Sequence, residues 1–273
     1  MVVELQLERV IDVNFNFHSH TARCMHAFGN DEDYVKAAIE AGFEEIGFSD
    51  HSPWPFGNGY VSPMRMGVQE LESYALSVMR LREKYKDKIK IRLGLECEYF
   101  EQHIPWLCAC CEKYGIEYLL LGNHFTPDEE NGIYNGRIKT PQQLESYKNH
   151  VLRALDSGLF LYLAHPDIFM RSYGEFDSYC AEASRQIIEK AIETGTPIEY
   201  NLLGFENTAA DGAKEGYPRD DFWKIAGSLG APAVIGLDAH NPESYIKKKE
   251  LFEKSELLLK EYGVQLVYPF GRN

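Results

Sequence analysis

The 273-residue chain is poor in basic side chains, with 28 Lys and Arg against 42 Asp and Glu and a formal net charge of -14. Nucleic acids are bound through clustered Lys and Arg that contact phosphates, so this balance excludes a general nucleic-acid surface. Bound divalent cations would offset the acidic charge locally, which leaves a small anionic ligand compatible with the chain. We therefore expect no nucleic-acid partner.

The sequence also lacks a secretion signal, a long apolar run and a disulfide framework. Its N-terminus has neither a basic region followed by an apolar core nor an apolar span of about twenty residues. The six cysteines follow no regular pattern, and three of them crowd into Cys108-Ala-Cys110-Cys111. That CxxC has no second Cys or His pair at zinc-finger spacing, so helix packing is favoured over a metal or redox site. We expect reduced thiols, a cytoplasmic protein and no membrane partner.

No Pro-, Gly- or Ser-rich linker divides the chain, so we expect one domain over residues 1–273. Short apolar segments alternate with longer helix-like ones, which is typical of βαβ units and a parallel sheet. The expected strands cover residues 11–17, 45–48, 90–95, 118–121, 160–164, 197–201 and 233–237. The expected helices cover residues 31–41, 68–85, 103–114, 141–157, 177–194, 220–229 and 242–262. Glycine follows most of these helices, as a left-handed C-cap requires. Seven such units favour an α/β barrel, whose active site forms at the carboxyl ends of the strands.

Candidate metal ligands gather at those strand ends. His18 and His20 stand at positions i and i+2 of an extended segment and therefore project to the same side. Any single strand-end histidine could be a structural polar residue, but seven of the nine histidines lie at or near such junctions: His18, His20, His26, His51, His124, His165 and His240. Two carboxylates, Glu96 and Asp238, join them. Because a parallel barrel brings its strand ends to one mouth, these residues predict a metal centre. Nitrogen and oxygen donors suit zinc, manganese or iron better than calcium.

Together these motifs resemble the polymerase and histidinol phosphatase (PHP) superfamily, and most closely its monofunctional histidinol-phosphatase branch. The resemblance rests on His18-Ser-His20 with His26, Ser49-Asp50-His51, Gly94-Leu-Glu96, Gly122-Asn-His124, Ala164-His165-Pro166 and Gly236-Leu-Asp238-Ala-His240. It implies a distorted (β/α)7 TIM-like barrel that holds three divalent metal ions. The implied ligands are His18, His20, Glu96 and Asp238 for the first ion, Glu96, His124 and His165 for the second, and His26, His51 and His240 for the third. The implied reaction is hydrolysis of L-histidinol phosphate, a small phosphomonoester, in histidine biosynthesis.

A hydroxide held between two cations that share Glu96 is the hypothesised nucleophile, since a bound metal lowers the pKa of water to about 7. Asp238 either handles the proton of that water or acts as a plain ligand. Asp50 and Ser52 are less favoured as nucleophiles, because no phosphatase signature surrounds them. Arg171 and Arg219 are the candidate phosphate contacts.

The resemblance also implies a role for Asn201 in shaping the substrate pocket. Two other functions stay open. One is a PHP-type phosphoesterase that acts on nucleotide bisphosphates or oligonucleotide ends, and the other is a metal-binding module without activity. The sequence leaves the oligomeric state open, with a homodimer as one candidate assembly.

Overall fold

The computed structural model describes residues 14–57, 59–213 and 215–271. Eight strands form one sheet in the order β1-β2-β3-β4-β7-β8-β9-β10, and every neighbouring pair is parallel. They are β1 (Phe15–Asn16), β2 (Glu45–Phe48), β3 (Lys90–Cys97), β4 (Tyr118–Leu121), β7 (Tyr162–Leu163), β8 (Ile198–Asn201), β9 (Pro232–Gly236) and β10 (Gln265–Leu266). Residues 11–13 of the first expected strand lie outside the described residues.

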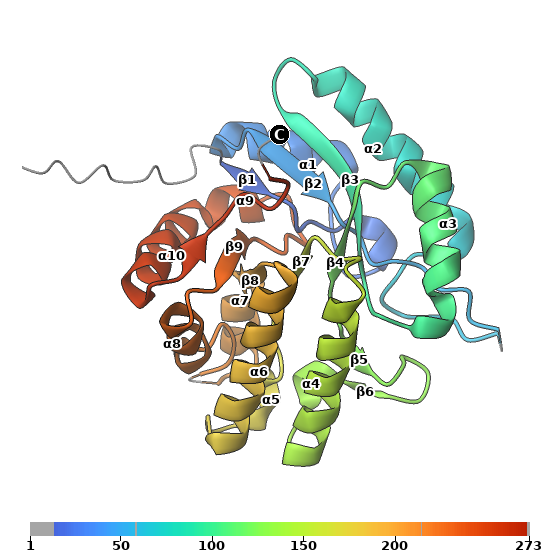
Figure 1. The fold of residues 1–273 in the computed structure, drawn as a ribbon. Helices are drawn as coiled ribbons and strands as arrows, with labels where there is room; N and C mark the ends of the chain where they lie inside the picture. The colour runs from blue at the N-terminus through green and yellow to red at the C-terminus, as the bar shows by residue number, and fades with distance from the viewer. Residues whose placement is uncertain (1–13, 58, 214, 272–273) are drawn as a thin grey trace, which may run out of the picture.

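The sheet curls until β1, its first strand, meets β9, its seventh. Ser19 and Ala239, just beyond β1 and β9, form a parallel bridge. The amide of His20 donates to the carbonyl of Ala239 over 2.9 Å, and the amide of Ala239 donates to the carbonyl of His18 over 3.1 Å. At the amino ends of the strands, β9 pairs with β10 instead. Figure 1 shows helices around the outside of this barrel. The expected distorted (β/α)7 architecture is confirmed.

The main helices agree with the sequence expectations to within a few residues. They are α1 (Asp31–Ala41), α2 (Leu71–Tyr85), α3 (Ile104–Tyr114), α4 (Pro141–Asp156), α6 (Ser178–Thr194), α8 (Asp220–Ser228) and α10 (Lys249–Tyr262). Short 3-10 turns, Val68–Glu70 and Glu101–His103, precede α2 and α3. As the glycine pattern predicted, α1 ends at Gly42 with a φ of 85°.

One helix expectation is wrong. The expected helix over residues 242–262 is two helices, α9 (Ser244–Lys247) and α10, which meet at Lys248. The Lys248 ammonium is buried, donates to the carbonyl of Leu237 over 3.1 Å and lies 3.2 Å from Oε1 of Glu206. The chain turns at this point to bring a charged side chain inward, a tertiary contact that helical periodicity does not reveal.

Segments without a clear pattern also contain regular structure. A hairpin of β5 (Phe125–Thr126) and β6 (Ile133–Tyr134) follows β4. Two short helices, α5 (Met170–Tyr173) and α7 (Leu203–Ala210), follow β7 and β8. All of them flank the carboxyl ends of the strands, so they form the walls of the candidate site.

Aromatic side chains fill the interior of the barrel. Phe15, Phe17, Tyr118 and Tyr162 form a buried cluster of their own, separate from the larger core between strands and helices. A methyl group on Gly94 would collide with the ring of Tyr118, so glycine is required there for close packing. Partly buried residues of the C-terminal segment, including Phe270, pack onto this cluster. None of the helices in the described ranges is long and apolar enough to cross a membrane.

Candidate metal centre

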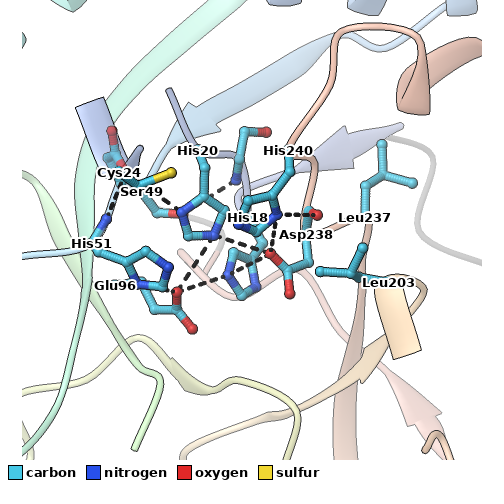
Figure 2. A network of polar contacts seen from close by, with 12 residues as sticks. His18, His20, Cys24, Ser49, His51, Glu96, Leu203, Leu237, Asp238 and His240 are labelled. Carbon is cyan, nitrogen blue, oxygen red and sulfur yellow. Dashed lines mark hydrogen bonds and ion pairs between the residues drawn. The ribbon is translucent and has the colours of Figure 1, made fainter. Parts of the chain in front are cut away.

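Nine side chains from separate strand ends meet at the carboxyl mouth of the barrel. They are His18 and His20 after β1, His26 after a 3-10 turn (Ala22–Cys24), His51 after β2, Glu96 in β3, His124 after β4, His165 after β7, and Asp238 and His240 after β9. Figure 2 shows six of them turned toward one another. Parallel strands place their carboxyl ends together, which is why residues more than 200 positions apart in the sequence lie side by side.

Glu96 occupies the middle of this cluster. Its Oε2 atom lies 3.4 Å from Nε2 of both His18 and His20 and 3.1 Å from Nδ1 of His51. Its Oε1 atom lies 2.8 Å from Nε2 of His165 and 3.4 Å from Nε2 of His124. The two oxygens of one carboxylate therefore face two different groups of imidazoles.

Asp238 faces His18 and His20, two of the imidazoles that also face Oε2 of Glu96. Its Oδ1 atom is 3.4 Å from Nε2 of His18, 3.0 Å from Nε2 of His20 and 3.3 Å from Nδ1 of His240. Its Oδ2 atom accepts a hydrogen bond from Nδ2 of Asn201 over 3.1 Å. One oxygen is thus fixed by the protein, and the other faces the imidazoles.

Several imidazoles are held in place by a contact at Nδ1, the ring nitrogen that points away from the cluster. Nδ1 of His18 lies 2.8 Å from Oε1 of Glu199, and Nδ1 of His26 lies 2.7 Å from the carbonyl oxygen of Cys24. Nδ1 of His124 lies 3.0 Å from Oε1 of Glu98. A ring that donates from Nδ1 in its neutral form has its lone pair on Nε2, which is the form that binds a metal.

Burial and mutual charge shift the pKa values of the cluster. Burial raises the pKa of Asp238 and of Glu96, but nearby histidines outweigh it and hold both pKa values well below the usual range. Burial lowers the pKa of His20, yet its contacts with Asp238, Asp50 and Glu96 raise that pKa to about 9. Burial and the proximity of His20 lower the pKa of His51. Both carboxylates are therefore ionised at neutral pH.

The residues present fit divalent metal ions. Buried atoms with no hydrogen-bond partner include Nε2 of His18, His20 and His240, Oε2 of Glu96 and Oδ1 of Asp238. Such orphaned atoms are costly in a folded protein, and a cation among them would remove the cost. Their ligand atoms also group within 4.8 Å of one another, for example in His18, His20 and Glu96, and in His20, His51 and His240.

One sulfur atom adds to the nitrogen and oxygen donors that the sequence indicated. The buried thiol of Cys24 lies within 4.8 Å of ligand atoms of His26 and His240.

A pocket of about 280 Å³ opens above the cluster. Beyond the candidate ligands, it is lined by Met64, Tyr134, Ile168, Arg171, Leu203, Asn207 and Tyr217. Arg171 reaches this pocket from α5, and its Nε atom donates to Oδ2 of Asp211 over 2.7 Å. A cationic side chain beside the cluster suits an anionic ligand.

The structure does not bring every expected contact to this pocket. Arg219 lines a separate hollow, where its Nε atom donates to Oδ2 of Asp221 over 2.9 Å. Asn201 is fully buried; its Nδ2 atom donates to Glu199 and Asp238, and its Oδ1 atom accepts from the amides of Leu203 and Gly204.

Asn201 therefore orients Asp238 and does not face the pocket. Asp50 and Ser52, the less favoured nucleophiles, are absent from the described lining of the pocket. The hydroxyl of Ser52 donates to the carbonyl of Pro53 over 3.1 Å.

Sequence reasoning missed two carboxylates that orient the histidines. Glu98 stands two positions after Glu96, and Glu199 two positions before Asn201. Residues at i and i+2 of a strand share a face, so this spacing was a signal that could have found them. The tyrosines of the pocket wall, Tyr134 and Tyr217, come from segments without a clear sequence pattern.

Comparison with known proteins supports the fold described above. The family model described as "PHP domain" matches residues 16–202, which include seven of the nine clustered side chains. A probable histidinol-phosphatase of Deinococcus radiodurans is 26% identical over 82% of this chain and 85% of its own length. A histidinol-phosphatase of Bacillus subtilis is 24% identical over 82% of this chain and 92% of its own.

A solved structure has a similar backbone. It is a histidinol phosphate phosphatase from Lactococcus lactis, crystallised with zinc, L-histidinol and phosphate. The two chains superpose with a TM-score of 0.69 and 19% identity over 93% of this chain and 95% of the other.

Proposed function

The chain belongs to the PHP domain family, and from that premise we propose that it is a phosphatase that hydrolyses L-histidinol phosphate to L-histidinol and inorganic phosphate, a step of histidine biosynthesis. Relatives named histidinol-phosphatase align with 82% of the chain. The observation that carries the proposal is the position of Glu96, whose two oxygens face two separate groups of buried imidazoles. A carboxylate in that position can serve two cations at once.

Three divalent ions, zinc, manganese or iron, are part of the proposal. His18, His20, Glu96 and Asp238 would hold the first, Glu96, His124 and His165 the second, and His26, His51 and His240 the third. When bound, such ions lower the pKa of water and neutralise the charge that develops on a phosphoryl group in the transition state.

The side chains of the pocket supply orientation and proton handling. Asp238 is ionised and fixed through Oδ2 by Asn201, so Oδ1 is positioned either to take the proton of the attacking water or to serve only as a ligand. Arg171 is the proposed phosphate contact, because it lines the pocket beside the cluster and carries a positive charge. Its Nε and NH2 atoms donate to Asp211, so its contact with phosphate would compete with that pair. Arg219 and Asn201 lie outside the lining of the pocket and are not proposed as substrate contacts.

Phosphate release from L-histidinol phosphate, compared with release from nucleotide bisphosphates and short oligonucleotides, tests the proposed substrate. We expect histidinol phosphate to be preferred, since a pocket of about 280 Å³ suits a small molecule and the chain is strongly acidic. A hundredfold preference for a nucleotide would instead favour the second phosphoesterase function. No release from any of these compounds at full metal occupancy would favour a metal-binding module.

The homodimer stays a candidate assembly, and the cytoplasmic location stays a prediction. Light scattering of the metal-loaded protein measures the first, and fractionation of the source cells measures the second.

A further inference from the structure

A buried polar network lies behind His124, on the side away from Glu96. Nδ1 of His124 lies 3.0 Å from Oε1 of Glu98, and NH2 of Arg65 donates to the same oxygen over 2.9 Å. The other oxygen of Glu98 accepts a hydrogen bond from Nε1 of Trp54 over 3.0 Å. Both oxygens of this fully buried carboxylate are therefore occupied.

Arg65 joins three separate segments through its planar fork. Nε donates to Oε2 of Glu129 over 2.6 Å, NH1 to the carbonyl of Ser52 over 2.9 Å, and NH2 to Glu98. These partners belong to the turn between β5 and β6, the segment after β2 and the segment after β3. Arg65 is 2% exposed, so each of its three nitrogens needs a partner inside the protein, and each has one.

Charge fixes the protonation of the network. Oε1 of Glu98 accepts a hydrogen bond from the guanidinium of Arg65, and Oε2 accepts one from the indole N–H of Trp54, as expected of a carboxylate paired with arginine. An ionised Glu98 can only accept hydrogen bonds, so Nδ1 of His124 must be the donor. Nε2 then carries the lone pair, and it is the atom that faces Oε1 of Glu96.

The other oriented histidines have simpler support. Glu199, behind His18, accepts hydrogen bonds from the amide of His165 and from Asn201. Asp50, whose Oδ1 atom lies 3.6 Å from Nδ1 of His20, accepts from the hydroxyl of Thr21. Neither carboxylate has an arginine partner within the described ranges. A buried ion pair that costs desolvation is better explained by a need for fixed geometry than by stability.

We propose that Arg65 and Glu98 are positioning residues that set the affinity of the second metal ion by fixing the tautomer and the ring plane of His124. The inference rests on the proposed function, in which His124, His165 and Glu96 hold that ion. Loss of such an orienting partner typically weakens metal binding by about 10- to 100-fold. Because Arg65 also ties the segment after β2 to the hairpin, it links two walls of the pocket to one candidate ligand.

Equilibrium dialysis against Mn²⁺ or Zn²⁺, with the bound metal counted by mass spectrometry, tests this directly. We expect wild type to hold three ions, and Arg65→Met and Glu98→Ala to hold one of the three about 10- to 100-fold more weakly. Glu98→Gln keeps an oxygen that can accept from Nδ1, so its loss should be smaller than that of Glu98→Ala. This partial rescue would not follow from general destabilisation.

Arg92 and Glu45 provide the matched control. They form another buried or partly buried Arg–Glu pair, at the amino end of the barrel. Arg92→Met and Glu45→Gln should lose stability without any change in the affinity of the three ions. A fall in affinity equal to that of the Arg65 and Glu98 variants would overturn the inference.

The ring of His124 gives a readout that needs no activity measurement. In ¹⁵N NMR of the metal-free protein, recorded at a pH where the ring is neutral, His124 should carry its proton on Nδ1, and Glu98→Ala should shift the population toward Nε2. If Arg65→Met does not fold, Glu98→Gln and this spectrum still decide the question. Wild-type binding of three ions with unaffected variants would overturn the inference alone, whereas no metal binding by wild type would overturn the proposed function with it.

Discussion

At the carboxyl end of the barrel, imidazoles and carboxylates face one another and buried polar atoms lack hydrogen-bond partners. At the amino end, aromatic rings pack edge to face: the centroid of Phe270 lies 4.9 Å from that of Phe17 and 5.6 Å from that of Tyr118. There the guanidinium of Arg92 lies 3.7 Å from the Phe270 ring centroid and also pairs with Glu45. One end of the sheet is therefore packed with aromatic rings and an Arg–Glu pair, and the other end holds buried polar atoms without hydrogen-bond partners.

The backbone shows the same contrast. Asn123, His165 and Asp238 have φ values of 44°, 32° and 47°, and each lies just beyond a strand at the carboxyl end. Such conformations cost of the order of 1 kcal/mol or more each, and they persist where the surrounding structure holds them. The amino end supplies the packing that stabilises the barrel, and the carboxyl end gives up stability to hold the candidate metal ligands in place. Substitutions at the two ends should therefore have separable effects.

The largest expected effect is at the carboxyl end. Glu96→Ala should lower phosphate release by about 1,000-fold or more, because it removes the carboxylate that faces both groups of imidazoles. Circular dichroism should show a folded protein, since the aromatic cluster is untouched. Activity within tenfold of wild type would contradict the role given to Glu96.

The second prediction concerns the amino end. Phe270→Ala should lower the free energy of unfolding by about 2 kcal/mol, because it removes ring contacts with Phe17, Tyr118 and Arg92. Urea unfolding measures the loss, and dialysis should still find the wild-type number of bound ions. A loss of bound metal with no loss of stability would contradict the claim that the two ends have separate roles.

The third prediction concerns Arg171 and Arg219, and it tests which of the two arginines contacts the substrate. Arg171→Gln should raise KM by about tenfold, which corresponds to one lost charged contact with phosphate. Arg219→Gln should change KM by less than about threefold, because its side chain lines a different hollow and pairs with Asp221. Steady-state kinetics on histidinol phosphate distinguish the two variants, and the reverse order would move the substrate toward Arg219.

The last prediction concerns a dependence of stability on pH at the carboxyl end. In the metal-free protein, burial lowers the pKa of His20, but its acidic neighbours raise it from 6.5 to about 9. A raised pKa in the folded state means that the stabilising contribution is complete below pH 6.5 and is lost as the pH rises through about 9. Thermal unfolding between these pH values should show a loss of at most about 3 kcal/mol, the value that corresponds to this shift in pKa. His20→Asn should show a smaller loss, and an equal loss in both proteins would assign the titration elsewhere.

The sequence predicted the strand ends and the nine clustered side chains because both follow from local rules. Alternating strands and helices place every carboxyl end at one mouth, so His18 and His240 could be expected to meet without knowledge of any contact. The helix break at Lys248 and the position of Arg219 could not be predicted this way. Each depends on a partner far away in the chain. Lys248 lies 3.2 Å from Glu206, and the Arg219 amide donates to Asp167.

The residues that orient the histidines could be predicted from the sequence only in part. Glu98 lies just beyond β3 and two positions after Glu96, so its proximity to the cluster could be expected from the spacing. Its pairing with Arg65 was not, because Arg65 comes from a segment with no periodic pattern. The set of metal ligands itself stays a prediction until metal is counted in the protein.

The most direct test of this account is to strip the protein of metal, add Mn²⁺ or Zn²⁺ stepwise, and follow both bound metal and phosphate release from L-histidinol phosphate. We predict no release without metal, full release when three ions are bound to each chain, and loss of release when a chelator is added. Equal release from the metal-free protein, or none at full occupancy, would contradict the account.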